Sequence, residues 1–259
     1  MVTIMRQTIL KIRRIIIKYG IAVAIKRALI WLYKYPQKKY VRQKLGRLNS
    51  KEIFTAIHKV NYWQSTESVS GPGSELKRTQ NLITELPQII EKLFIKQVID
   101  APCGDYNWMQ KVTNKTPISY LGVDIVDDII AKNQRKHQAP EINFEVGDIR
   151  NIKYPDADLL IVRDCLFHLS YADTNEFLNN FSKSNITYLL TTTHTDLKSN
   201  FTNKDIKTGD FRKIDLFKPP YNFDRSKNIY EISDYYGTDY PKSLVLVKKI
   251  DVPGMTSFK

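Results

Sequence analysis

One short segment decides the fold: Val98-Ile-Asp-Ala-Pro-Cys-Gly-Asp-Tyr-Asn-Trp-Met109. Its pattern predicts a buried strand that ends at Asp100, then a turn, then the start of a helix. Such a junction is where an open α/β sheet meets a nucleotide, and a dinucleotide-binding turn carries three glycines. Only Gly104 stands in this turn. The neighbouring segments must therefore identify the ligand.

Composition limits the class of protein. The chain has 259 residues, of which 42% are hydrophobic and 26% charged, which is typical of one sizeable folded core with an appendage. Its two cysteines, Cys103 and Cys165, are too few for a disulfide framework and lack the spacing of a zinc site. We therefore expect a cytoplasmic protein with no bound metal and with two small, buried thiols.

The excess charge is confined to the N-terminal region. Formal net charge is +13, and residues 1–50 hold 13 Lys or Arg and no Asp or Glu. The other 27 basic residues are balanced by all 27 acidic residues. The charge distribution predicts two parts, a basic extension over 1–50 and an enzyme-like domain over 51–259.

The extension has a helical period. Ile9, Ile12 and Ile16 share one face of a helix, and Lys11 and Arg14 lie opposite. A second apolar stripe follows between residues 21 and 32, and the longest uncharged run is far too short to span a bilayer. These features favour peripheral attachment of residues 1–44 to an anionic membrane surface, at the inner face of the cytoplasmic membrane. Packing on a core or partner subunit, or binding of nucleic acid, are the alternatives.

From residue 51 onward, strand and helix patterns alternate. Predicted strands cover 96–100, 119–124, 142–146, 158–163 and 187–192; predicted helices cover 75–94, 127–136 and 171–181, with another from about 107. Two further strands are expected near 229–233 and 243–249. Apolar strands that alternate with helices indicate a parallel sheet covered on both faces.

Acidic residues follow the early strands. Asp100 and Asp124 end the first two strands, Asp148 follows the third, and Asp164 follows the fourth. Because ligands of open α/β sheets bind beyond the carboxyl ends of the strands, these residues predict a site lined by carboxylates. Such a site suits a cationic or hydroxyl-rich ligand and disfavours a phosphate.

Four segments together resemble a known family. Val-Ile-Asp100-Ala-Pro-Cys-Gly104, Tyr-Leu-Gly-Val-Asp124-Ile, Gly147-Asp148-Ile and Asp158-Leu-Leu-Ile-Val-Arg-Asp164-Cys-Leu-Phe-His168-Leu are similar to the successive motifs of class I S-adenosylmethionine-dependent methyltransferases. The resemblance covers about residues 65–250. It implies a Rossmann-like, doubly wound, mostly parallel seven-stranded sheet with an antiparallel C-terminal edge. Segments at 67–74, 205–210 and 217–222 resemble a bacterial branch that we associate with surface-polysaccharide biosynthesis.

The resemblance also implies a cofactor site. Gly104 would let the turn pass beside S-adenosylmethionine, Asp100 would orient the turn or the ammonium group, and Asp124 would accept both ribose hydroxyls. Asp148 would accept from the adenine amine, with the ring between Ile125 and Ile149. The full set of cofactor residues expected is Asp100, Ala101, Cys103, Gly104, Asp124, Ile125, Asp148, Ile149 and Arg163. Pro102 and Tyr106 replace two glycines of the family, which leaves the path of the turn open.

Methyl transfer to oxygen needs a group that takes a proton. Alignment supplies most of the catalysis, and a His or carboxylate near the methyl group acts as base. The candidates are Asp164 and His168 after the fourth strand and His194 after the fifth. We expect His194, because His168 lies in an apolar run where a structural histidine is as good an interpretation.

A long segment, 194–228, precedes the last strands. It is too long for an idle loop and is rich in polar and aromatic residues. It would either cover the fold structurally or bind a polar acceptor through Asp196, Asp205, Asp210, Arg212, Tyr221 and Asn222, with Tyr221 stacking on the acceptor.

The sequence thus predicts a methyltransferase that acts on an oxygen of a glycan or glycolipid-like acceptor. One alternative is an RNA methyltransferase that grips phosphate through its basic extension, although the neutral domain lacks the interleaved basic and aromatic residues typical of RNA binding. The other is a scaffold that keeps the fold without catalysis.

Overall fold

The computed structural model describes residues 20–21, 36, 38–234, 237 and 240–255. The chain divides into two compact units, Met1–Lys44 and Leu45–Lys259. In the first unit the described residues 38–44 are helical. The predicted apolar stripes lie outside the described residues, apart from Ile21, which is exposed.

The second unit is built on one sheet of seven strands, in the order β3-β2-β1-β4-β5-β7-β6. The strands are β1 (Gln97–Asp100), β2 (Ser119–Asp124), β3 (Ile142–Val146), β4 (Ala157–Val162), β5 (Ile186–His194), β6 (Tyr230–Ser233) and β7 (Lys242–Lys248). The α-helices are α3 (Ser50–Lys59), α4 (Gln80–Lys92), α5 (Met109–Thr113), α6 (Asp127–His137) and α7 (Tyr171–Ser182).

The pairing of the strands confirms the predicted fold class. Strands β1 to β5 are parallel, and β7 lies antiparallel between β5 and β6. The predicted and observed elements agree closely, except that the helix expected from Glu75 begins at Gln80. A 3-10 turn over Pro72–Ser74 precedes it, after Gly71 has taken a left-handed φ of 101°.

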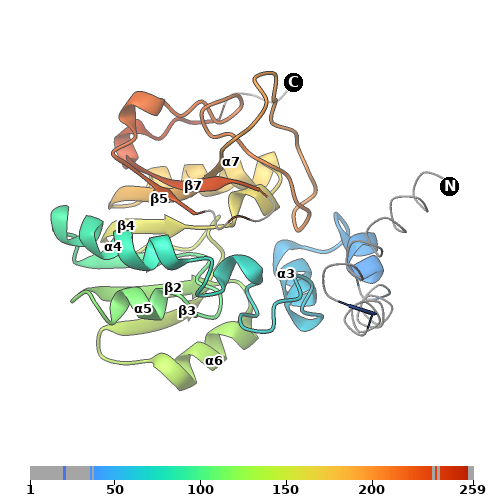
Figure 1. Ribbon diagram of the computed structural model, residues 1–259, viewed down its shortest axis with the longest axis horizontal. Coiled ribbons are helices and arrows are strands. Elements are labelled where there is room, and N and C mark those ends of the chain that lie inside the picture. The colour runs from blue at the N-terminus through green and yellow to red at the C-terminus, as the bar shows by residue number, and fades with distance from the viewer. Residues whose placement is uncertain (1–19, 22–35, 37, 235–236, 238–239, 256–259) are drawn as a thin grey trace. The chain divides into compact units, whose positions relative to one another are not determined.

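Alternate residues of each strand pack on opposite faces of the sheet. Val98, Leu159 and Leu190 belong to a core that α4, α5 and α6 cover. Their neighbours Ile99 and Leu160 belong to a second core, which α7 and apolar residues of the segment 194–228 cover. Figure 1 shows these helices along the strands. Helices therefore lie on both faces, and an irregular segment completes the second one.

Two caps position the helices that flank the carboxyl edge of the sheet. Asn49 and Glu52 form a capping box at α3, with reciprocal side chain-to-backbone bonds of 2.9 Å. The Ser170 hydroxyl accepts from the Asp173 amide at the start of α7. Among the residues that the structure describes, no helix is both long and apolar enough to cross a membrane.

Candidate active site

An open cleft lies at the carboxyl edge of the sheet, where β1 and β4 are neighbours. This is the topological switch point, since the chain leaves these two strands toward opposite sides of the sheet. The predicted residues that line the cleft are Asp100, Cys103, Gly104, Asp124, Ile125, Asp148, Ile149, Arg163, Asp164 and His168. The structure therefore brings together residues spread over four strand ends.

Asp124 is held in place by the turns on either side of it. Its carboxylate accepts hydrogen bonds from the amides of Gly104 and Val126, both at 3.0 Å. Burial raises the pKa of Asp124 to about 6, although these two amides oppose the shift. A carboxylate has about four lone-pair sites, so Asp124 keeps acceptor capacity for a hydroxyl donor in the cleft.

The turn after β1 is a close-packed junction. Gly104 has a φ of 54°, and a Cβ at this position would lie 2.1 Å from the Ser70 hydroxyl. Asp105 binds the Ser68 hydroxyl at 2.8 Å, the Val69 amide at 2.9 Å and the Ser70 hydroxyl at 3.0 Å. The single glycine is thus required by the approach of the segment around Ser70, which also lines the cleft.

The backbone at Tyr106 shows how the turn is formed without the second glycine. It keeps a left-handed φ of 58° at a position where the family has glycine. Its ring is buried, with centroids 5.0 Å from Tyr120 and 5.1 Å from Phe144. We attribute the conformation to this packing, which offsets the cost of a positive φ in a bulky residue.

Asp100 is the most deeply buried of the strand-end acids, with 2% of its surface exposed. It accepts a hydrogen bond of 3.0 Å from the Tyr120 hydroxyl. Burial raises the pKa of Asp100 to about 7, although the Tyr120 bond and the charge of Arg163 favour the ionised form. Near neutral pH its carboxyl group is therefore partly protonated.

Asp148 lies in the cleft but is already paired. Arg150 binds it with the side chain Nε at 3.0 Å and the backbone amide at 3.0 Å, and Arg150 also pairs with Asp173 on α7 at 2.5 Å. This ion pair fixes the direction of the carboxylate, because both oxygens face Arg150. The role expected for Asp148 toward an adenine amine stays a prediction.

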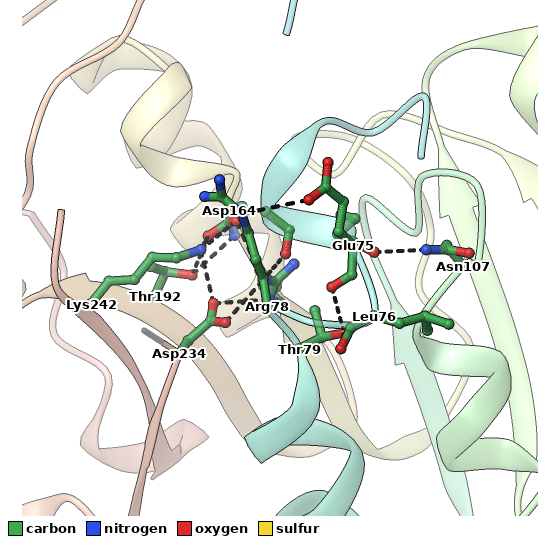
Figure 2. A network of polar contacts seen from close by, with 12 residues as sticks. Glu75, Leu76, Arg78, Thr79, Asn107, Asp164, Thr192, Asp234 and Lys242 are labelled. Carbon is green, nitrogen blue, oxygen red and sulfur yellow. Dashed lines mark hydrogen bonds and ion pairs between the residues drawn. The ribbon is translucent and has the colours of Figure 1, made fainter. Parts of the chain in front are cut away.

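Figure 2 shows the polar network around Asp164. The Lys242 ammonium binds both oxygens of the Asp164 carboxylate, and it lies 2.8 Å from Asp234. The Asp164 amide donates to the Thr192 hydroxyl at 3.0 Å. Burial alone would raise the pKa of Asp164, but the charges of Arg163 and Lys242 hold that pKa well below its usual range. Asp164 is therefore a fixed anion and a poor proton acceptor.

Arg163 joins this network from the core. Its guanidinium binds Asp234 at 2.9 and 3.0 Å and the Gly73 carbonyl oxygen at 2.7 Å. Gly73 also approaches Asp164 closely, since a Cβ there would lie 2.7 Å from its carboxylate. The side chain of Arg163 thus ties the turn at 72–74 to the sheet while it lines the cleft.

The two candidate histidines differ in position and in tautomer. His168 lines the cleft, and its Nδ1 lies 2.7 Å from the Asp210 carbonyl oxygen, so this nitrogen carries the proton and Nε2 has the free lone pair. His194 accepts from the Ile214 amide through Nδ1, is 5% exposed and is not among the residues that line the cleft. Burial and the charge of Lys242 lower its pKa to about 4. Burial also lowers the pKa of His168.

Tyr221 and Arg212 were both expected to bind the acceptor, but both are buried. Tyr221 is 0% exposed, so it cannot stack on an acceptor, and this prediction is wrong. Its hydroxyl oxygen accepts from Arg212 at 2.7 Å, and the buried Arg212 lies over the Tyr171 ring at 4.5 Å. Asp205 accepts from the Tyr171 amide at 2.7 Å and from Arg212 at 3.2 Å. This part of the segment 194–228 therefore covers the second core.

The other expected acceptor residues lie outside the residues that line the cleft. Asp196 and Asn222 have left-handed φ values of 54° and 52° in turns. Asp210 supplies its backbone carbonyl to His168, while its side chain is exposed. Ala101 is fully buried next to the cleft.

Sequence reasoning missed several residues of the site. Trp63 and Ser70 line the cleft, and Arg150, Asp234 and Lys242 hold its carboxylates. Only the glycine-bearing segment around Ser70 carried a usable signal, because two glycines beside a proline mark an unusual backbone. The ion pairs of Asp234 with Arg163 and of Lys242 with Asp164 join residues more than 70 positions apart, which no local pattern encodes.

Within the described residues, no group of three or more His, Cys, Asp or Glu side chains is placed to hold a metal ion. Both cysteines are buried beside the cleft, and burial raises the pKa of each thiol above its usual value. A protonated thiol is a weak nucleophile, so the two side chains act as small apolar groups.

Residues 98–184 match the family model described as a methyltransferase domain. No curated protein sequence matches the chain significantly.

The fold is similar to that of solved methyltransferases. Magnesium protoporphyrin IX methyltransferase from Synechocystis PCC 6803, solved with bound SAM, has a TM-score of 0.55 at 11% identity, over 77% of this chain and 97% of that one. Human N-acetylserotonin methyltransferase in complex with SAM has a TM-score of 0.52 at 13% identity, over 82% and 66%. A putative O-methyltransferase from Nostoc punctiforme PCC 73102 has a TM-score of 0.52 at 12% identity, over 83% and 68%.

Proposed function

Since the chain is a class I S-adenosylmethionine-dependent methyltransferase, we propose that it methylates a hydroxyl oxygen of a glycan or glycolipid-like acceptor. The observation that carries this proposal is the placement of His168. It lines the cleft with its Nδ1 proton held by the Asp210 carbonyl oxygen, which leaves Nε2 as a proton acceptor.

The residues of the cleft fit the cofactor. The cleft is lined by Asp100, Asp124, Asp148 and Asp164, which suit a cationic ligand, and the turn at Gly104 offers no loop for a phosphate. Asp124 would bind the ribose hydroxyls, and Ile125 and Ile149 would contact the adenine ring. When bound, the cofactor supplies a methyl group on a positively charged sulfur.

His168 would then act as the general base. In an in-line displacement, the acceptor oxygen forms a bond to the methyl carbon as the carbon–sulfur bond breaks, and the hydroxyl proton moves to Nε2 of His168. The charge that develops on the imidazole is favoured by the nearby Asp164 carboxylate, which raises the pKa of His168 against the effect of burial. Asp164 itself stays ionised and does not take the proton from the acceptor.

Mass spectrometry of methylated surface glycans, lipids and RNA from cells with and without the protein tests the acceptor class. We expect a methyl ether on a glycan or glycolipid to disappear with the protein. Loss of a methylated RNA nucleotide, with glycans and lipids unchanged, would instead support RNA as the acceptor. Calorimetry with S-adenosylmethionine and S-adenosylhomocysteine tests the cofactor, and no binding of either would contradict catalysis.

We also propose that residues 1–44 attach the enzyme to the inner face of the cytoplasmic membrane. The basic and apolar periodicity of this region supports the proposal, because lysines and arginines meet anionic lipid while isoleucines insert. The full chain should sediment with anionic liposomes, and the double variant Ile12→Asp, Ile16→Asp should not. Salt should weaken the attachment only in part, whereas binding to RNA would fall steeply with salt.

A further inference from the structure

Two aromatic side chains, Trp63 and Phe211, lie beside the proposed base, His168. Trp63 and His168 both line the cleft, with ring centroids 5.6 Å apart. The ring centroid of Phe211 lies 5.9 Å from that of His168. The proposed base therefore has two aromatic neighbours, Trp63, which lines the cleft, and Phe211, which is exposed.

The position of Trp63 is fixed by its neighbours. Gly71 packs against it so closely that a Cβ at residue 71 would lie 3.0 Å from the Trp63 Cβ. The half-buried side chain therefore packs directly on residue 71, and the His168 ring is a second close neighbour of the indole. A ring held in one place costs little further entropy when a ligand packs on it.

Phe211 is the more exposed of these two aromatic side chains. It is 41% exposed, and its inner edge packs on Phe167 with ring centroids 5.5 Å apart. Tyr240, also partly exposed, stacks on Phe211 at 5.4 Å. A large aromatic side chain that is both held and exposed next to a cleft is typical of a ligand-binding surface.

The charges of the cleft limit the chemistry of the acceptor. The cleft is lined by four carboxylates, and its two arginines are already paired, Arg150 with Asp148 and Arg163 with Asp234. Two of these carboxylates, Asp148 and Asp164, are paired with cations as well, and among the described residues of the lining no unpaired Arg or Lys remains for an acceptor ring that carries phosphate or carboxylate. A neutral ring with several hydroxyl groups would find hydrogen-bond acceptors at its rim and an aromatic surface under its apolar C–H face.

We propose that Trp63, with Phe211 as the second aromatic neighbour of His168, forms the acceptor subsite and binds a neutral pyranose ring by stacking, so that one ring hydroxyl faces Nε2 of His168. This inference rests on the proposed O-methylation and adds the class of ring and the residue that selects it. Trp63 acts by binding and orientation, so its loss should raise KM more than it lowers kcat.

The test measures methyl transfer to a panel of soluble acceptors. The panel holds neutral methyl hexopyranosides and methyl 6-deoxyhexopyranosides, the matching uronic acid glycosides, and simple phenols. We expect transfer to at least one neutral pyranoside and none to its uronic acid counterpart. For the accepted pyranoside, Trp63→Ala should raise KM about tenfold or more, a size expected for a lost ring contact. Trp63→Phe should restore most of the affinity.

Two controls separate the possible failures. Phe94→Ala removes a strongly exposed aromatic ring outside the cleft and should leave KM unchanged. The affinity of each variant for S-adenosylmethionine, measured by calorimetry, should stay within twofold of wild type. Transfer to phenols or uronic acids but to no neutral pyranoside, or an unchanged KM in Trp63→Ala, would overturn the subsite. Failure of the enzyme to bind the cofactor would instead overturn the proposed function.

Discussion

The Nδ1 atom of His168 lies 2.7 Å from the backbone carbonyl oxygen of Asp210. The two residues are 42 positions apart, and this contact sets the tautomer of the imidazole. It leaves Nε2 without a proton, as a general base requires. Because the partner is a backbone carbonyl, substitution of the Asp210 side chain should leave the tautomer of His168 unchanged.

The first prediction separates the two histidines. His168→Ala should lower kcat about 100-fold, because a general base is lost, while the affinity for S-adenosylmethionine changes less than twofold. His194→Gln, which changes a buried histidine outside the cleft, should keep kcat within about threefold at a temperature where the protein is folded. Single-turnover kinetics with the identified acceptor measures both. The reverse pattern would assign the base to His194.

The second prediction concerns Asp124 and pH. Hydrogen bonds to a charged acceptor contribute roughly 1.5–3 kcal/mol each, so Asp124→Asn should weaken cofactor binding tenfold or more at pH 8. Burial raises the pKa of Asp124 to about 6, so wild-type affinity should fall as the pH drops through that value and the carboxylate takes a proton. Calorimetry between pH 5 and 8 should show this decline in wild type. A decline centred near pH 6 that persists in Asp124→Asn would contradict the assignment.

The third prediction links Asp100 to stability. Burial raises the pKa of its carboxyl group from 3.8 to about 7, so the folded state keeps a proton that the unfolded state loses. The free energy of unfolding should therefore decrease as pH rises from about 4 to 7. Asp100→Asn removes the ionisable group and can keep the Tyr120 bond.

This variant should be more stable than wild type at pH 8, by roughly 2–4 kcal/mol on the scale of about 1.4 kcal/mol per pKa unit, and similar to wild type at pH 4. Urea unfolding at both pH values measures the difference. Equal differences at pH 4 and pH 8 would show that the carboxyl group does not titrate in this range.

The fourth prediction tests the buried ion network. Asp234 is 1% exposed at its side chain and pairs with both Arg163 and Lys242. Asp234→Asn should reduce the free energy of unfolding by about 3–5 kcal/mol, because it removes one of the two carboxylates that balance the charges of Arg163 and Lys242 and leaves only Asp164 beside both cations. Asp156→Asn, at an exposed position, should change it by less than about 0.5 kcal/mol. Guanidinium unfolding at pH 7 compares them, and equal midpoints would show that the network does not stabilise the fold.

Much of the fold follows from local patterns. The apolar runs that end at Asp100 and Asp124 identify buried strands, and their alternation with helical periods indicates a parallel sheet. In such a sheet the carboxyl ends meet at one edge, so the acids of separate motifs could be assigned to one site before any side chain was placed. This reasoning needs only the period of the chain and the direction of the strands.

The roles of individual side chains depend on packing between distant segments. The pattern around Tyr221 is that of an exposed, polar loop, but its ring fills the second core beneath Arg212. His194 is the last residue of β5, and His168 ends a 3-10 turn that follows β4; of the two, only His168 lines the cleft.

The sequence alone determined the order of strands and helices along the chain and the acidic edge of the sheet. Both follow from hydrophobic periods and turn residues, which can be recognised within short segments. Only the tertiary structure decided which histidine lines the cleft, which acids are paired and which aromatic residue lies beside the base. Lys242 reaches Asp164 across 78 positions, and Trp63 reaches His168 from before the first strand. These contacts depend on how distant segments pack against one another. The free energy of that packing depends on many residues at once, so no short stretch of sequence determines it.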